Sequence, residues 1–232
     1  MKQKVLVTGA SRGIGFAMAK QFAEAGYAVY ALWHNAKEQL DEVGALDITP
    51  VHGDVADAAS VAAVREAVGD VDILVNNAAI SRFGLVTDLS EAEWDEMMAV
   101  NLKSVFLLTR AFLPGMIHQK SGKIINVSSI FGAVGGSCEV AYSAAKAGVI
   151  GFTKALAKEV GPSGIQVNCI APGVIDTAMN ARLSAEDLAA LRDETPLGRL
   201  GTPEDVAKLA LFLAEDRFIT GEVLHIGGGY LR

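Results

Sequence analysis

Cysteine is scarce in this chain of 232 residues, which holds only Cys138 and Cys169. Two cysteines make no disulfide framework, and their separation does not fit a Cys-x-x-Cys metal or redox pair. Both are expected to be free thiols in a reducing compartment. No metal site is expected either, because no two of the four histidines are paired at ligand spacing: His34, His52, His118 and His225.

Long apolar runs and an excess of positive charge are also missing. No 18 consecutive residues are uninterruptedly apolar, so no membrane span is expected. The apolar stretch of the opening MKQKVLVTGA stops at Thr8 and Gly9 without a signal-cleavage pattern, which together with the free thiols predicts a cytoplasmic protein. Twenty Lys and Arg against 27 Asp and Glu give a net charge of -7, which argues against nucleic acid as a main partner because phosphate binding requires a basic surface.

The sequence does contain a regular alternation of short apolar runs and longer helical patterns. Expected strands are 5–8, 28–33, 49–53, 73–77, 123–128, 166–170 and 223–226. Expected helices are 13–25, 58–68, 91–112, 140–160 and 203–214, the last with Thr202 as its N-cap. The pattern predicts an α/β fold: one doubly wound Rossmann-type domain over residues 1–232, with a seven-stranded parallel sheet and helices on both faces. Residues 174–200 interrupt the alternation, and we expect them to form a mobile lid over the carboxyl ends of the strands.

A glycine-rich loop directly follows the first expected strand. It reads Gly9-Ala10-Ser11-Arg12-Gly13-Ile14-Gly15 and leads into a helix, whose free N–H groups favour phosphate. Taken alone, such a loop is as easily a simple turn as a nucleotide site.

Several further motifs make the whole chain resemble the short-chain dehydrogenase/reductase family. The G-x-x-x-G-x-G spacing behind Thr8 is joined by Asn76-Asn77-Ala78-Ala79, by Tyr142-x-x-x-Lys146 with Ser129 thirteen residues earlier, and by Pro172-Gly173. The family commonly has a glycine where this chain has Ala79. Within the family the chain looks most like bacterial 3-oxoacyl-[acyl-carrier-protein] reductases, in Ser163–Asn168 and Thr220–Glu222.

The resemblance implies a nicotinamide cofactor. It assigns cofactor binding to Gly9, Ser11, Arg12, Gly13, Ile14, Gly15, His34, Asp54, Val55, Asn77, Ala78, Tyr142, Lys146, Pro172, Gly173 and Thr177. NADP(H) is expected rather than NAD(H), because the second strand ends in Leu32-Trp33-His34-Asn35 without the acid that holds an unphosphorylated ribose, and Arg12 supplies a cation. Arg12 could also be a solvated loop charge, and Asp54 a turn acid.

The resemblance also implies a catalytic set of Asn101, Ser129, Tyr142 and Lys146. Tyr142 and Lys146, four residues apart on one helix, share a small volume. The tyrosine would protonate the ketone oxygen, and lowering its pKa by about 3 from the usual 10 corresponds to about 4 kcal/mol of stabilisation by the lysine and the oxidised nicotinamide. Ser129 would stabilise the developing oxyanion, and Asn101 would hold a water that links Lys146 to solvent.

The substrate is expected to be a ketone that becomes a secondary alcohol, contacted by Ser129, Tyr142, Met179 and Leu183. The first candidate substrate is a 3-oxoacyl-[acyl-carrier-protein]. Relatives that use it dock the carrier protein with two basic residues. This chain keeps one of them, Lys120, and has Ser163 at the other position. A different ketone is the alternative substrate, such as the 5-aminopentanone modification on elongation factor P, because residues 136–140 resemble the corresponding segment of reductases that act on it. Glu139 is either a contact for a cationic substrate or, as the sequence favours, a solvated loop acid.

The resemblance further implies a homotetramer, with interfaces on the helices 91–112 and 140–160 and on the last helix and strand. Leu209, Phe212 and Leu213 offer apolar surface there, although an intramolecular core would use the same residues.

The alternative from another functional class is a dinucleotide-binding regulator that does not turn over a substrate. It would be favoured by loss of Ser129, Tyr142 or Lys146, and all three are present.

Overall fold

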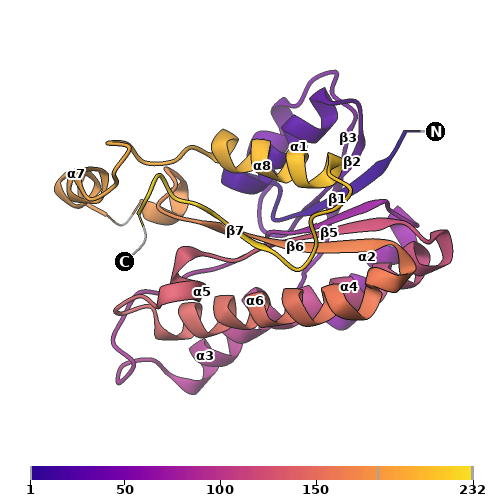
Figure 1. Ribbon diagram of the computed structural model, residues 1–232. Coiled ribbons are helices and arrows are strands. Elements are labelled where there is room, and N and C mark those ends of the chain that lie inside the picture. Colours follow the sequence, from indigo (N-terminus) through magenta and orange to yellow (C-terminus); the bar gives the residue numbers. More distant parts are fainter. Residues whose placement is uncertain (1, 182, 231–232) are drawn as a thin grey trace.

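The computed structural model describes residues 2–181 and 183–230. Seven parallel strands form one sheet in the order β3-β2-β1-β4-β5-β6-β7 (Figure 1), which confirms the predicted parallel α/β sheet. The strands are β1 (Lys4–Thr8), β2 (Ala28–Trp33), β3 (Ile48–His52), β4 (Ile73–Asn76), β5 (Gly122–Val127), β6 (Ile165–Pro172) and β7 (Val223–Ile226). Each lies within two residues of its predicted range.

Helices cover both faces of the sheet (Figure 1), as expected for strands whose side chains are buried on both sides. One face carries α1 (Gly13–Glu24) and α8 (Pro203–Glu215), and the other carries α2 (Ala58–Val68), α4 (Ser104–Gln119) and α6 (Val140–Val160). The smaller helices are α3 (Glu91–Met98), α5 (Ile130–Val134), α7 (Ala185–Asp193), the π-helix η2 (Ala99–Lys103), and the 3-10 helices η1 (Glu38–Glu42), η3 (Gly161–Ser163) and η4 (Ala178–Asn180).

The predicted helix over residues 91–112 was wrong in its extent and regularity. The helical chain runs from Glu91 to Gln119 through the π turn at Ala99–Lys103, and Pro114 lies inside α4 rather than ending it. Proline costs a backbone hydrogen bond in a helix interior. Full burial of Phe112 and Met116 on either side of Pro114 offsets that loss.

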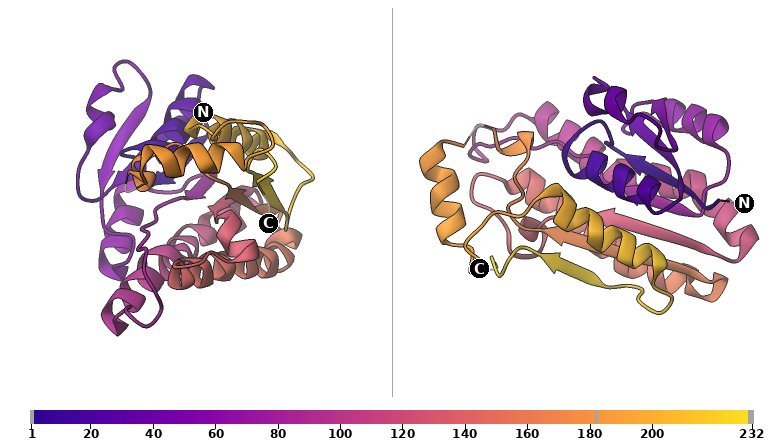
Figure 2. Two further views of the ribbon diagram at one scale, coloured as in Figure 1. Left: turned by 90° about the vertical axis from the view of Figure 1, so that its left-hand side faces the viewer. Right: turned by 90° about the horizontal axis from the view of Figure 1, so that it is seen from above.

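The chain around residues 174–200 lies at the carboxyl end of the sheet. The right-hand view of Figure 2 shows α7 (orange) standing away from the helices that cover the two faces of the sheet. A capping box closes the start of α7: the Ser184 hydroxyl accepts from Asp187 N at 3.1 Å, and Asp187 Oδ2 accepts from Ser184 N at 3.0 Å. The two ends of the segment meet at Ile175 and Gly201, where Gly201 N donates to Val174 O at 3.0 Å.

Candidate active site

A cavity of about 310 Å³ opens where β4, β5 and β6 end. Parallel strands bring all their carboxyl ends to one edge of the sheet, which is where open α/β folds bind ligands. The cavity wall brings together ten of the predicted site residues: Ile14, Asn77, Ser129, Tyr142, Lys146, Pro172, Gly173, Thr177, Met179 and Leu183.

Tyr142 and Lys146 project from successive turns of α6, and both are buried. The Lys146 ammonium lies 5.7 Å from the centroid of the Tyr142 ring and donates to Val127 O at 2.8 Å. Ser128 fixes the same turn of helix, since its hydroxyl donates to the Lys146 carbonyl at 2.8 Å. A phenol and a cation therefore share the floor of the cavity, as the spacing predicts.

Ser129 faces Tyr142 from the N-cap of the five-residue helix α5. Its hydroxyl oxygen accepts from Phe131 N at 3.1 Å, and the hydroxyl also forms a hydrogen bond with the Tyr142 phenol. The backbone contact leaves the hydroxyl proton of Ser129 available to the phenol or to a substrate oxygen. Periodicity could not reveal α5, because five residues are too short to show a helical pattern.

In the cofactor-free protein the pKa of Tyr142 is raised, whereas the expected lowering includes the charge of the bound, oxidised nicotinamide and stays a prediction. Burial raises the pKa of Tyr142 to about 12, the hydrogen bond from Ser129 opposes the rise, and the Glu139 carboxylate adds to it. The Lys146 ammonium is directed to the Val127 carbonyl and is not among the groups that shift the pKa of the phenol. Burial also lowers the pKa of Lys146 to about 8, partly countered by the Cys169 thiol.

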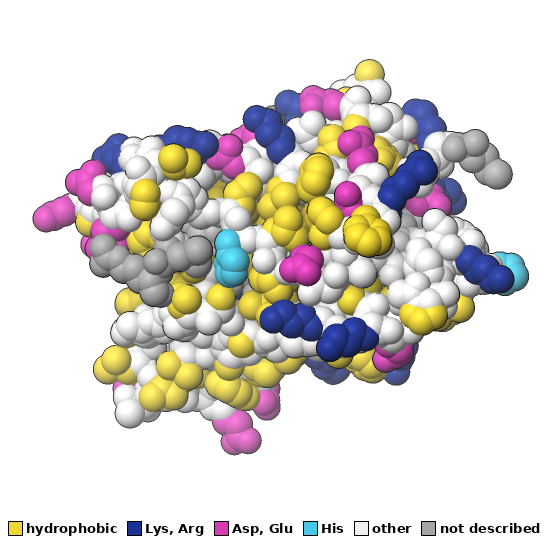
Figure 3. Space-filling view, viewed as in Figure 1, with side chains coloured by type: hydrophobic (Ala, Val, Ile, Leu, Met, Phe, Trp, Pro, Cys, Tyr) yellow, Lys and Arg dark blue, Asp and Glu magenta, His cyan; other side chains and the backbone are white. Residues whose placement is uncertain are grey.

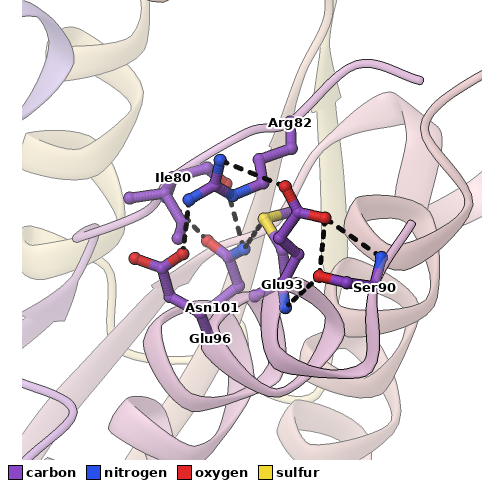
Figure 4. Close-up of polar contacts among 7 residues, drawn as sticks. Ile80, Arg82, Ser90, Glu93, Glu96 and Asn101 are labelled. Carbon is purple, nitrogen blue, oxygen red and sulfur yellow. Dashed lines mark hydrogen bonds and ion pairs between the residues drawn. The ribbon is translucent and has the colours of Figure 1, made fainter. Parts of the chain in front are cut away.

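Asn101 lies in the π turn, buried beside the loop that follows β4. Its side-chain amide pairs with the backbone of Ile80: Oδ1 accepts from Ile80 N at 2.9 Å and Nδ2 donates to Ile80 O at 3.0 Å (Figure 4). Asn101 thus fixes the loop at Ile80, and its part in a proton relay stays a prediction.

The glycine loop packs so tightly against itself and against the residues after β4 that side chains at Gly9 and Gly15 would not fit. A Cβ at Gly9 would lie 2.8 Å from Ala78 Cα, and one at Gly15 would lie 2.1 Å from Gly9 O. Gly9 and Gly13 also adopt positive φ values of 64° and 55°. Asn77 secures the loop, because its Nδ2 donates to Thr8 O at 2.9 Å.

This loop fits the phosphates of a dinucleotide. It brings backbone to the start of the 12-residue helix α1, whose first N–H groups have no side-chain cap. Arg12 is exposed at the N-cap position, and Ser11 and Gly13 flank it.

His34, Asp54, Val55 and Ala78 lie outside the cavity wall, in the loops that follow β2, β3 and β4. His34 is exposed after β2, and Val55 is buried behind β3. Asp54 Oδ1 accepts from Ala56 N at 2.8 Å, which is the turn contact that the sequence left open beside its adenine role. All of these residues lie at the same edge of the sheet as the glycine loop.

Comparison with known proteins supplies the family. A family model described as enoyl-(acyl carrier protein) reductase matches residues 9–231. The 3-oxoacyl-[acyl-carrier-protein] reductase FabG of Vibrio cholerae is 44% identical over 97% of this chain and 95% of its own length, and that of Staphylococcus aureus is 43% identical over 99% and 98%. The chain is a short-chain dehydrogenase/reductase.

Solved structures agree with this assignment. A 3-oxoacyl-[acyl-carrier protein] reductase from Brucella melitensis superposes with a TM-score of 0.91 at 38% identity, over 98% of this chain and 90% of that one. A protein named as a gluconate dehydrogenase from Agrobacterium tumefaciens has the same TM-score at 32% identity, over 98% and 95%. This short-chain dehydrogenase/reductase is therefore an oxidoreductase with a nicotinamide dinucleotide cofactor, while the names of its relatives span several substrates.

Glu139 is the site residue that sequence reasoning placed wrongly. It is 5% exposed and lines the cavity, so the favoured interpretation as a solvated loop acid is wrong. Cavity residues that the sequence did not single out include Ser81, Phe83, Phe131 and Leu191. Ser81 and Phe83 lie in the loop after β4, Phe131 in α5 and Leu191 in α7, and spacing carries no signal that these separate segments share a surface.

Lys120 and Ser163, the two positions at which carrier docking was expected or doubted, lie at the opposite edge of the sheet. Lys120 ends α4 just before β5, and Ser163 ends η3 just before β6, whereas the cavity lies where β5 and β6 finish. A carrier protein bound over Lys120 and Ser163 would therefore sit at the far edge from the cavity of the same chain.

The described residues offer neither a cluster of metal ligands nor an exposed apolar helix. Among residues 2–181 and 183–230, no three His, Cys, Asp or Glu side chains gather in a way that could hold a metal ion. Within the same residues, the helical stretch Glu91–Gln119 is long and apolar enough by composition to span a membrane. Its buried side chains pack in the core over the sheet, as in Leu107, Leu108 and Phe112.

Proposed function

We propose that this short-chain dehydrogenase/reductase uses NADPH to reduce a ketone to a secondary alcohol, with 3-oxoacyl-[acyl-carrier-protein] as the first candidate substrate. The observation that carries the proposal is the convergence of Ser129, Tyr142 and Lys146 on one cavity beside the glycine loop. Full-length identity of 43–44% to two FabG reductases supports the substrate.

The roles of the residues follow from their contacts. The bound nicotinamide would supply the hydride. Tyr142 would give its proton to the ketone oxygen, and Ser129, already bonded to the phenol, would donate to the same oxygen as charge develops. The Lys146 ammonium would stabilise the phenolate that remains, which requires it to turn from Val127 O toward the phenol or the cofactor ribose. Asn101 would keep the loop of Ile80 in place and return protons through a water.

The segment 174–200 would act as the lid of a single domain spanning residues 1–232. Met179 and Leu183 line the cavity, which supports their assignment as substrate contacts, and Met179 is 46% exposed. No described side chain of α7 is buried, so the lid has little packing of its own to lose on opening. The prediction of a mobile lid includes residue 182, which lies outside the described residues.

A second candidate is another ketone, such as the 5-aminopentanone modification on elongation factor P. Ser163, which stands where carrier-docking relatives have a basic residue, favours it, as does the burial of Glu139 in the cavity wall. Following NADPH absorbance with acyl thioesters, carrier-bound 3-oxoacyl chains and free ketones decides between the two. A carrier-bound substrate turned over with the highest kcat/KM supports the first candidate, and preference for free or aminated ketones supports the second.

NADPH should be preferred over NADH, and Arg12→Ala should reduce that preference by about tenfold or more. The guanidinium at the N-cap of α1 would make a charge-assisted, bidentate contact with the 2′-phosphate. Steady-state kinetics with both cofactors measure the ratio. Equal use of the two cofactors by the unaltered protein would contradict the assignment.

We also propose a homotetramer in the cytoplasm. Figure 3 shows apolar side chains gathered over α8 and β7, and Phe212 on α8 is 51% exposed, whereas Leu213 belongs to the core. Phe106 on α4 is 44% exposed under the guanidinium of Arg110. If each of these two faces pairs with the same face of another copy of the chain about a two-fold axis, the two interfaces together close a tetramer. Light scattering at micromolar concentration should give four chain masses, and a single chain mass would refute the assembly.

A further inference from the structure

The end of β5 holds helix α6 at three successive residues. Val127 O accepts from the Lys146 ammonium at 2.8 Å, and the Ser128 hydroxyl donates to the Lys146 carbonyl at 2.8 Å. The Ser129 hydroxyl is hydrogen-bonded to the Tyr142 phenol. A small movement of this segment relative to α6 would therefore change all three contacts.

Gly132, in the short helix α5, lies directly against the backbone of α6 (Figure 1). A Cβ at Gly132 would lie 2.7 Å from the carbonyl carbon of Lys146, 2.8 Å from its oxygen and 2.6 Å from Ser128 Oγ. Carbon atoms in contact are normally about 3.5 to 4 Å apart, so a side chain at this position would push α5 and α6 apart by roughly 1 Å.

The backbone of Gly132 does not itself require glycine. Gly132 is not among the residues with a positive φ, so alanine could adopt its conformation. Alanine also favours a helix over glycine by about 1 kcal/mol. The close contact with the Lys146 carbonyl is thus the physical reason for a glycine inside α5.

Displacement of α5 would move Ser129, because Ser129 is the N-cap of this helix. Gly132 N donates to Ser129 O at 3.0 Å, and the Ser129 hydroxyl accepts from Phe131 N at 3.1 Å. These two bonds join Ser129 and Gly132 in one turn of α5. The contact between Gly132 and Lys146 therefore sets how far the Ser129 hydroxyl lies from Tyr142.

We propose that Gly132 is a positioning residue for the reductase site: its missing side chain lets α5 lie against the Lys146 carbonyl, which holds Ser129 within hydrogen-bond distance of Tyr142. The inference rests on the proposed ketone reduction and adds a residue that lies outside the cavity wall. Gly132 acts through Ser129, since a shift of about 1 Å in a reacting group lowers a rate by about a hundredfold.

Kinetics with acetoacetyl-N-acetylcysteamine, a small 3-oxoacyl thioester, test this role. Gly132→Ala should lower kcat by about ten- to a hundredfold and leave the KM of the thioester and the Kd of NADPH within about threefold. In a Ser129→Ala background, the same substitution should lower kcat by less than about threefold, because both changes act through one hydroxyl.

Gly161→Ala is the matched control at the other end of α6. Gly161 has a helical φ of −52°, and a Cβ there would meet nothing within 4 Å. This variant should keep the wild-type kcat, which separates the loss of a glycine from the loss of the contact between α5 and α6.

A spectroscopic measurement follows the Ser129–Tyr142 bond without turnover. In protein whose tyrosines carry an isotopic label at Cζ, the Tyr142 resonance is assigned by its loss in Tyr142→Phe. Ser129→Ala should shift this resonance, and Gly132→Ala should shift it in the same direction. Gly161→Ala should leave it in place.

The two measurements separate this proposal from the proposed function. If the thioester is not reduced but Gly132→Ala still shifts the Tyr142 resonance as Ser129→Ala does, the positioning role stands and the reduction of this ketone fails. If the thioester is reduced and a folded Gly132→Ala keeps the wild-type kcat and resonance, the positioning role is overturned and the reduction stands. An equal loss of kcat with and without Ser129 would also overturn it.

Ser128→Ala tests the same contact if thermal denaturation shows that Gly132→Ala does not fold. The substitution introduces no clash and removes the hydroxyl that binds the Lys146 carbonyl. It should shift the Tyr142 resonance in the direction seen for Ser129→Ala, and an unshifted resonance would overturn the positioning role.

Discussion

Tyr142→Phe is expected to lower kcat by about a hundred- to ten-thousandfold while leaving NADPH binding within a few-fold of the wild-type value. The substitution removes one oxygen, and that oxygen is the proton donor. The contacts that support the dinucleotide loop, such as Asn77 with Thr8, lie elsewhere and stay intact. Steady-state kinetics and fluorescence titration of NADPH measure the two quantities.

The fold of that variant should be unaffected. Ser129 keeps its contact with Phe131 N at 3.1 Å, and the loss of one hydrogen bond to the phenol costs about 1 kcal/mol. Retained turnover in a folded Tyr142→Phe protein would remove Tyr142 from the catalytic role. Ser128→Ala is a useful comparison, because Ser128 holds the Lys146 carbonyl and touches no reacting group in this account.

Lys146→Met should abolish reduction and yet stabilise the cofactor-free protein. Burial lowers the pKa of Lys146 from 10.5 to about 8, so keeping the ammonium charged in the fold costs roughly 3 kcal/mol at pH 7. Methionine has a similar length without the charge, and it loses only the bond to Val127 O, worth about 1 kcal/mol. Chemical denaturation at pH 7 should show a net gain of about 1 to 3 kcal/mol.

The gain should fade as the pH rises. Between pH 8 and 10.5 the unfolded wild-type chain binds a proton at Lys146 that the folded chain has released, so wild-type stability increases with pH in this window. The methionine variant lacks this group, and the difference between the two proteins should narrow through pH 9. A variant less stable than wild type at pH 7 would show that Lys146 is stabilised by contacts stronger than the one to Val127.

Much of this architecture can be predicted from sequence because its signals are local. The seven strands are short β-branched runs between helical patterns, and Thr202-Pro203-Glu204-Asp205 predicts the start of α8, where Thr202 Oγ1 accepts from Asp205 N at 3.3 Å. Tyr142 and Lys146 are similarly predictable, since a spacing of four places them on one helical face.

What could not be predicted depends on contacts between distant segments. Glu139 resembles a loop acid until the loop of Ser81 is folded against it, and 58 residues separate the two. The high pKa of Tyr142 has the same origin, because the desolvation of its phenol is set by the whole cavity and the direction of the Lys146 side chain by the Val127 carbonyl. The π turn at Asn101 also left no pattern, since one extra residue per turn barely disturbs helical periodicity.

NADPH oxidation in the presence of ketones tests the central claim most directly: that Ser129, Tyr142 and Lys146 form a working reductase site. Purified protein is incubated with NADPH and a panel of 3-oxoacyl thioesters and free ketones, and cofactor absorbance is followed together with the alcohol formed. Wild type should form one alcohol for each NADPH consumed, and Tyr142→Phe should form almost none. NADPH that binds but is not oxidised with any ketone, or oxidation that persists unchanged in Tyr142→Phe, would contradict it.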